Sequence, residues 1–108
     1  MAVYGRFYFK KTTNGNLIGE YSNHGMDYNQ TESADLKVPF ESIDHYIGKY
    51  LSTWRDDKSS ILMDLNIRHK PGSNGCIFDL EWEVDGKTKF KGQGFLCDDI
   101  LIGDYTDH

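Results

Sequence analysis

The feature that most constrains this chain is an alternation of apolar and polar residues, with a period of two, that recurs from one end to the other. Such alternation is typical of strands with one buried face, and here turn residues separate the alternating stretches. Asn14-Gly15, Asp85-Gly86 and Asp98-Asp99 contain residue types that tolerate the positive φ of tight connections. We predict strands over residues 3–11, 16–23, 35–40, 46–54, 60–69, 76–84, 88–96 and 100–106.

The chain length sets the domain organisation. With 108 residues we expect one domain, residues 1–108, around a single core. The predicted strands cover a larger share of the chain than is usual, and a closed meander is an architecture that reaches such a share. The predicted fold class is therefore all-β, an antiparallel up-and-down meander of roughly eight strands that closes into a small β-barrel.

The hairpin around Asp85-Gly86 shows how the pattern sets a strand register. A three-residue loop, 85–87, places Trp82 opposite Phe90 and joins two apolar faces, whereas a two-residue loop would place Trp82 opposite Lys89. We therefore predict the three-residue loop. The same register pairs Glu83 with Lys89 and Glu81 with Lys91.

Two segments are harder to interpret. Residues 41–54 carry apolar side chains at helical spacing, with Ser42 as a candidate N-cap, so a helix is one alternative. Gly48 and the density of β-branched and aromatic residues favour a strand over 46–54. Residues 24–34 are polar and show no periodicity, which predicts a loop.

The charge balance bears on partners and location. Twelve Lys and Arg stand against seventeen Asp and Glu, a formal net charge of −5. Nucleic acids and anionic membranes attract basic surfaces, so we expect no nucleic-acid partner and no membrane partner. No apolar run approaches the roughly 20 residues of a membrane-spanning helix, and the first residues show no secretory signal. We expect a cytoplasmic protein.

Residues with catalytic or metal-binding chemistry form no motif. Hydrolase, phosphate-binding and dinucleotide fingerprints are absent from the sequence. Asp56-Asp57 falls where a turn is expected, and Cys76 and Cys97 lack zinc or redox spacing, so we expect free thiols, with Cys76 facing the core. His69, at a strand end, is the histidine that we expect nearest to a cavity. Metal-ligand spacing is missing for His24, His45, His69 and His108. We predict no catalytic residue, no metal and no cofactor.

Glycine and tyrosine recur together on one strand face. The stretch 17–23, with Gly19 and Tyr21, returns as 101–107. A glycine beside a large ring permits a tight bend or lets a neighbouring ring lie across the strand. The inward aromatic residues on this register are Phe7, Phe9, Tyr21, Tyr50, Trp54, Phe78, Trp82, Phe90 and Tyr105. These rings either fill the barrel or leave room for one small ligand, and both alternatives stay open.

Two N-terminal stretches carry a resemblance to known families. Gly5-Arg6-Phe7-Tyr8, followed by Asn14–Tyr21, resembles the opening of avidin-like and lipocalin-like (calycin-type) barrels. The resemblance implies an eight-stranded up-and-down barrel with a ligand cavity at one mouth. It also matches Tyr21 and Asn23 to biotin-contacting positions of avidins, whereas Phe9 stands where avidins place a biotin-contacting Asn, which argues against biotin itself.

The function that we predict is non-catalytic binding of a small apolar or aromatic molecule inside the barrel. Rings would supply apolar contact, and hydroxyl groups would fix the ligand's orientation. We expect the ligand-binding residues to be Tyr21, Asn23, Tyr50, Ser52, Trp54, Trp82 and Tyr105. One alternative is a protein-interaction module with a filled core that acts through its outer wall and the 24–34 loop. A third reading is an enzyme with acid/base groups at the barrel mouth.

The outer wall is less polar than a solitary barrel needs. Apolar residues expected on the outward face are Ile18, Ile47, Leu51, Leu62, Ile77, Phe95 and Ile102. Clustered apolar patches mark protein association. We therefore expect a homodimer formed through Ile18, Ile77, Phe95 and Ile102.

Overall fold

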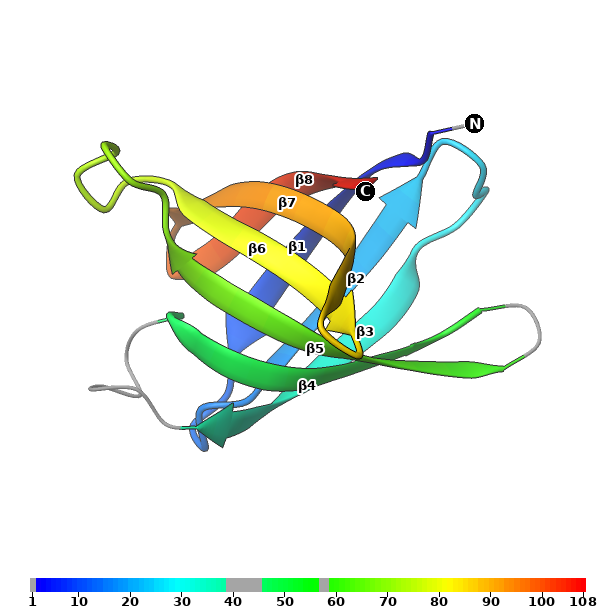
Figure 1. Cartoon of the computed structure of the whole chain (residues 1–108), viewed down its shortest axis with the longest axis horizontal. Helices are drawn as coiled ribbons and strands as arrows, with labels where there is room; N and C mark the ends of the chain where they lie inside the picture. The colour runs from blue at the N-terminus through cyan, green and yellow to red at the C-terminus, as the bar shows by residue number, and fades with distance from the viewer. Residues whose placement is uncertain (1, 39–45, 57–58) are drawn as a thin grey trace.

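The computed structural model describes residues 2–38, 46–56 and 59–108, which form one closed antiparallel β-barrel (Figure 1). Its strands are β1 (Tyr4–Lys11), β2 (Leu17–Asn23), β3 (Gln30–Val38), β4 (Gly48–Arg55), β5 (Ser60–His69), β6 (Phe78–Val84), β7 (Lys87–Cys97) and β8 (Ile100–Asp107). Each strand pairs with the next along the chain, and β8 returns to pair with β1. The predicted all-β, eight-stranded, up-and-down barrel is confirmed.

The barrel has two distinct ends because successive strands run in opposite directions. We call the end at which β2, β4, β6 and β8 finish the open end, and the end at which they begin the closed end. In Figure 1 the open end lies toward the right, where the N-terminus is marked, and the closed end lies toward the left. The closed end holds most of the core, and the open end holds the cavity described below.

The least periodic part of the sequence contains the largest error of prediction. β3 begins at Gln30, so the loop predicted over 24–34 is wrong for residues 30–34. These residues pair with β2, as in Tyr21↔Gln30, and with β4, as in Glu32↔Trp54. The alternation is hidden because the inward position in this stretch holds a glutamate. The strand predicted over 46–54 is confirmed for residues 48–54, in β4, whereas residues 46 and 47 precede it. The helical alternative for 41–54 falls partly on residues 41–45, which lie outside the described residues.

The β6–β7 hairpin has the predicted facing of rings but a different turn. Trp82 lies opposite Phe90, as expected, yet Val84 pairs with Lys87, so the loop has two residues rather than three. Asp85 and Gly86 have φ of 51° and 78°, and positive φ at both positions is the mark of a two-residue turn matched to strand twist. A register shift between Trp82 and Glu83 restores the pairing of apolar faces. Glu81 therefore pairs with Lys91 as predicted, whereas Glu83 pairs with Thr88 and not with Lys89.

The closed end is filled by side chains. Phe9, Leu17, Tyr50, Leu65 and Leu101 are each 0% exposed, and they interdigitate as the core of a small barrel does. Hydroxyl groups there are satisfied internally: Tyr50 Oη donates to the Tyr46 carbonyl at 2.7 Å. Tyr46 Oη in turn lies 2.7 Å from the Asp99 carbonyl oxygen. None of these residues lines the cavity described below, and both hydroxyl groups are paired within the protein.

Glycines allow the strands and rings to approach closely. A Cβ added at Gly19 would lie 1.8 Å from the carbonyl oxygen of Tyr8, so only glycine permits this spacing of β1 and β2. A Cβ added at Gly5 would lie 2.4 Å from the ring of Tyr105. The Tyr105 ring therefore lies across a glycine, as the sequence predicted for a glycine beside a large ring. The glycine is Gly5 on β1, which is outside the repeated stretches 17–23 and 101–107.

Two residues lie on a different face from the one predicted, one of them a cysteine and the other a residue predicted for the outer wall. Both thiols are free, as predicted, but Cys76 is exposed and does not face the core, because it precedes the start of β6 and its amide donates to the Ser73 carbonyl in a turn. Ile47 packs against the core instead of facing outward. The other outward predictions hold for Ile18, Leu51, Leu62, Phe95 and Ile102, which are exposed, and Ile77 is partly buried.

Candidate functional site

A cavity of about 370 Å³ lies inside the open end of the barrel. Every strand contributes at least one residue to its lining, from Phe7 on β1 to Tyr105 on β8. Alternation places these residues inward at the open end, just as it places the core residues inward at the closed end. The size lies at the small end of the range of about 300–1,000 Å³ that is typical of ligand pockets.

A closed cycle of aromatic rings surrounds this cavity. The ring centroids are 6.1 Å apart for Tyr21 and Trp54, 6.3 Å for Trp54 and Phe90, 5.9 Å for Phe90 and Tyr105, and 6.3 Å for Tyr105 and Tyr21. Interplanar angles of 71° to 81° make every contact edge-to-face, the arrangement that the ring quadrupoles favour. The rings come from β2, β4, β7 and β8, so only closure of the barrel brings them together.

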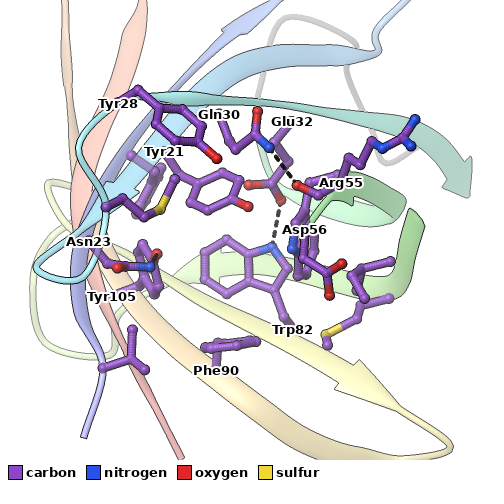
Figure 2. Close-up of a pocket in the computed structure, with 16 residues that line it drawn as sticks. Tyr21, Asn23, Tyr28, Gln30, Glu32, Arg55, Asp56, Trp82, Phe90 and Tyr105 are labelled. Carbon is purple, nitrogen blue, oxygen red and sulfur yellow. Dashed lines mark hydrogen bonds between the residues drawn. The ribbon is translucent and has the colours of Figure 1, made fainter. Parts of the chain in front are cut away.

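Two further rings lie deeper in the cavity. Trp82 and Phe7 are each 4% exposed, and they meet in an edge contact with centroids 5.7 Å apart. The indole nitrogen of Trp82 donates a hydrogen bond of 2.8 Å to Oε2 of Glu32. Figure 2 shows this bond among the rings that gather around the carboxylate. Trp82 therefore joins the aromatic lining to the one acidic side chain buried in the cavity wall.

Glu32 occupies an inward position of β3 and is 6% exposed. The Ser52 hydroxyl approaches from β4 and donates a 2.5 Å hydrogen bond to Oε2, the same oxygen that Trp82 contacts. Among the described residues, Oε1 receives no hydrogen bond and Glu32 forms no ion pair. The carboxylate thus has one oxygen held by the protein and one oxygen left for the cavity that it lines.

Burial sets the protonation of this carboxyl. Removal from water raises the pKa of Glu32 from 4.5 to about 7, while the hydrogen bonds from Ser52 and Trp82 act in the opposite direction. Both protonation forms are therefore populated near neutral pH. A group whose pKa burial brings near 7, in a concave site, is a usual mark of a functional position.

The rim of the cavity is more polar than its interior. Asn23 Nδ2 lies 3.4 Å from the Tyr105 hydroxyl, and Gln30 Nε2 donates to the Arg55 carbonyl at 2.8 Å. The Tyr21 hydroxyl has no hydrogen-bond partner among the described residues, and burial raises the pKa of Tyr21, so its hydroxyl stays protonated. It can therefore donate to, or accept from, a bound molecule.

The structure brings together most of the residues predicted for the pocket. Tyr21, Asn23, Trp54, Trp82 and Tyr105 all line the cavity. Tyr50 does not, since it is 0% exposed in the closed end and its hydroxyl is used internally. Ser52 lies behind Glu32 and acts on the site through that carboxylate rather than by lining the cavity.

Sequence reasoning missed Glu32, the side chain with the most specific chemistry in the cavity. It lies in the stretch interpreted as a loop, where a buried acid breaks the alternation that marks a strand. One signal could have found it: β2 needs a neighbour with which to pair, and residues 30–38 directly follow the connection after it. Tyr28 and Gln30, which also line the cavity, were missed for the same reason.

No histidine among the described residues lines the cavity. His69 is exposed at the closed end, where its ring lies 4.9 Å from that of Phe78, so its expected place near a cavity is wrong. His24 lies against Tyr4, and His45 falls outside the described residues. Across residues 2–38, 46–56 and 59–108, no group of His, Cys, Asp and Glu side chains is arranged to hold a metal ion. In the same residues no helix is long and apolar enough to cross a membrane.

In comparisons with known proteins, no family model, no curated protein and no solved structure matches this chain. The function must therefore be argued from the cavity itself.

Proposed function

We propose that this barrel is a non-catalytic binding protein that holds a small apolar or aromatic molecule in the cavity at its open end. The observation that carries the proposal is the cavity of about 370 Å³ enclosed by a cycle of aromatic rings. Proteins close-pack their interiors, and at the closed end this chain does so. An aromatic-lined space at the other end is the form that ligand sites usually take.

The polar groups of the cavity support a specific orientation of the ligand. The polar groups in the lining include the Glu32 carboxylate and the Tyr21 and Tyr105 hydroxyls. A site with broad apolar contact and a few placed polar groups selects ligands by both shape and hydrogen bonding. We also propose kinship with avidin-like and lipocalin-like barrels, which the meander order and a cavity at one mouth support.

A screen by thermal shift tests the proposal. A ligand that binds only the folded barrel must raise its melting temperature. The matched variants are Ile61→Phe, which adds volume to a residue that lines the cavity, and Leu62→Phe, which adds it to the exposed outer wall one position along β5. We expect compounds that stabilise the wild type and Leu62→Phe to lose their effect on Ile61→Phe, and to be recovered chemically unchanged.

Three results would overturn the proposal. A broad library of small apolar and aromatic compounds that never raises the melting temperature would leave the cavity without a ligand. Compounds that stabilise both variants equally would bind elsewhere on the barrel. Turnover of a stabilising compound, seen by NMR, would move the protein from binding to catalysis at the same site.

A second proposal concerns the outer wall. Phe95 on β7 lies opposite Ile102 on β8, and Ile102 lies opposite Tyr8 on β1, so three exposed apolar residues form one row across neighbouring strands. Ile18 is exposed on the adjacent β2. We propose that this row is the contact of a homodimer. Sedimentation should show a dimer that Ile102→Lys dissociates, and a wild-type monomer at high concentration would exclude it.

A further inference from the structure

The Glu32 carboxylate has an unused oxygen that is directed to the cavity. Oε2 accepts both hydrogen bonds that the protein supplies, from Ser52 at 2.5 Å and from Trp82 at 2.8 Å. Oε1 receives none among the described residues, although the side chain is 6% exposed. Among the described residues no side-chain oxygen or nitrogen is both fully buried and unpaired, so Oε1 opens onto the cavity that Glu32 lines. It has acceptor capacity that a bound molecule with an N–H or O–H group can use.

The donors on Oε2 affect the balance between the ionised and the protonated form of the Glu32 carboxyl. The Trp82 indole nitrogen can only donate, and the Ser52 hydroxyl approaches the same oxygen. Both contacts favour the ionised carboxylate, whereas burial favours the protonated acid, so both forms are populated near neutral pH. In its ionised form this carboxylate forms no ion pair within the described residues, so a cation from outside can pair with it.

The aromatic cycle suits the same kind of group. Because neighbouring centroids are 5.9 to 6.3 Å apart, a group at the centre of the cycle lies within about 6 Å of all the ring centroids, the range over which cations are attracted to ring faces. Tyrosine and tryptophan make up most of this cycle, and these rings attract cations best. Aromatic rings around a carboxylate form a site for organic ammonium ions, whereas a purely apolar ligand would use only the rings.

Other charged groups near Glu32 do not change this conclusion. Tyr21 and Tyr105, which face it from β2 and β8, are neutral phenols, and burial raises the pKa of each. Ser52 and Trp82 face it from β4 and β6 and carry no charge. Arg55 and Asp56 are exposed at the rim of the cavity and carry opposite charges.

We propose that the ligand is a small organic ammonium ion whose N–H group donates to Oε1 of Glu32 and whose body lies within the cycle of Tyr21, Trp54, Phe90 and Tyr105. The inference rests on the proposed binding function and names its ligand class. Inside the barrel the ammonium exchanges its hydration for one charged hydrogen bond and contact with the rings. The cavity volume restricts the body to roughly the size of one aromatic ring with a short chain.

Isothermal titration with matched amines and alcohols tests this ligand class. The probes are butyl-, benzyl- and 2-phenylethylamine, each paired with the alcohol of the same carbon skeleton, at a pH at which the amines are protonated. We expect at least one amine to bind about tenfold more tightly than its alcohol, as a charged hydrogen bond supports. Glu32→Gln should bring the pair to within about threefold, whereas Glu20→Gln, which removes the same charge from β2 outside the cavity lining, should leave the preference intact.

Proton release provides a readout that does not depend on a variant. Near pH 6.5 part of Glu32 is protonated, so pairing with an ammonium ion must displace that proton. Titrations in two buffers of different ionisation enthalpy should therefore show proton release with the amine and none with the alcohol.

The outcomes separate the two proposals. Alcohols that bind as tightly as amines, or an amine preference that survives Glu32→Gln, would overturn the ammonium inference and leave small-molecule binding intact. Failure of every amine and every alcohol to bind, together with an empty thermal-shift screen, would overturn both.

Discussion

The two ends of the barrel are built from the same alternation of residues and yet differ in how tightly they pack and in how their hydroxyl groups are bonded. At the closed end, Leu65 and Tyr50 are fully buried and the Tyr50 hydroxyl is bonded to a backbone carbonyl. At the open end, Met63 and Tyr21 are partly buried, and the Tyr21 hydroxyl has no partner among the described residues. In one barrel, the packed half of the lumen can thus stabilise the fold while the other half keeps space for a bound molecule.

The largest test of this comparison uses two positions on the same face of β5. Leu65→Ala should lower the free energy of unfolding by about 2–5 kcal/mol, because it opens a cavity in a packed core. Met63→Ala should cost roughly 1 kcal/mol, since Met63 borders a space that is already present. Urea unfolding measures both. Equal losses of unfolding free energy at the two positions would contradict the claim that the closed end is packed and the open end is not.

A second test concerns the pH dependence of stability. Between the ordinary pKa of 4.5 and the folded value of about 7, the folded state holds a proton on Glu32 that the unfolded state has released. The free energy of unfolding should therefore fall as pH rises from 4.5 to 7, by about 3 kcal/mol from this group, and level off above. Urea unfolding across this range should show that the free energy of unfolding of Glu32→Gln rises relative to that of the wild type as pH rises. Parallel profiles would mean that Glu32 is not buried as described.

The smallest test compares two hydroxyl groups. Tyr50→Phe removes the donor to the Tyr46 carbonyl and should lower the free energy of unfolding by about 1–2 kcal/mol. Tyr21→Phe removes a hydroxyl without a partner among the described residues, so its effect should stay within about 0.5 kcal/mol. Thermal and urea unfolding report both values. A Tyr21→Phe loss as large as that of Tyr50→Phe would show that the open end is as tightly organised as the closed end.

Much of the fold and part of the site could be predicted from the sequence. Alternation and turn chemistry identified the meander, and the inward faces followed from the same period, which is why Tyr21, Trp54, Trp82 and Tyr105 were correctly placed at the cavity. The pattern could not say how far along the barrel axis each inward residue lies. Tyr50 and Tyr21 share the same alternation, and only the strand pairing puts one at the closed end and the other at the open end.

The burial of Glu32 could not be predicted from the alternation of residues. An acid at an inward strand position looks like a loop residue, because its burial depends on partners that lie 20 and 50 residues away, Ser52 and Trp82. The β6–β7 hairpin is a milder case. There the facing of Trp82 and Phe90 led to a predicted three-residue loop, whereas the turn has two residues, Asp85 and Gly86, both with positive φ. The bulge that reconciles this turn with the facing of the rings could not be read from the pattern.

By itself the sequence determined that this chain forms strands, where most of them turn, and which aromatic residues face inward, because these properties follow from local φ preferences and from a period of two. The tertiary structure alone decided that one half of the lumen is filled and the other is open. It also decided that four rings from separate strands close into a cycle, and that one carboxylate is buried beside it. Those outcomes depend on strand register and barrel closure, which bring together residues that are distant in the chain.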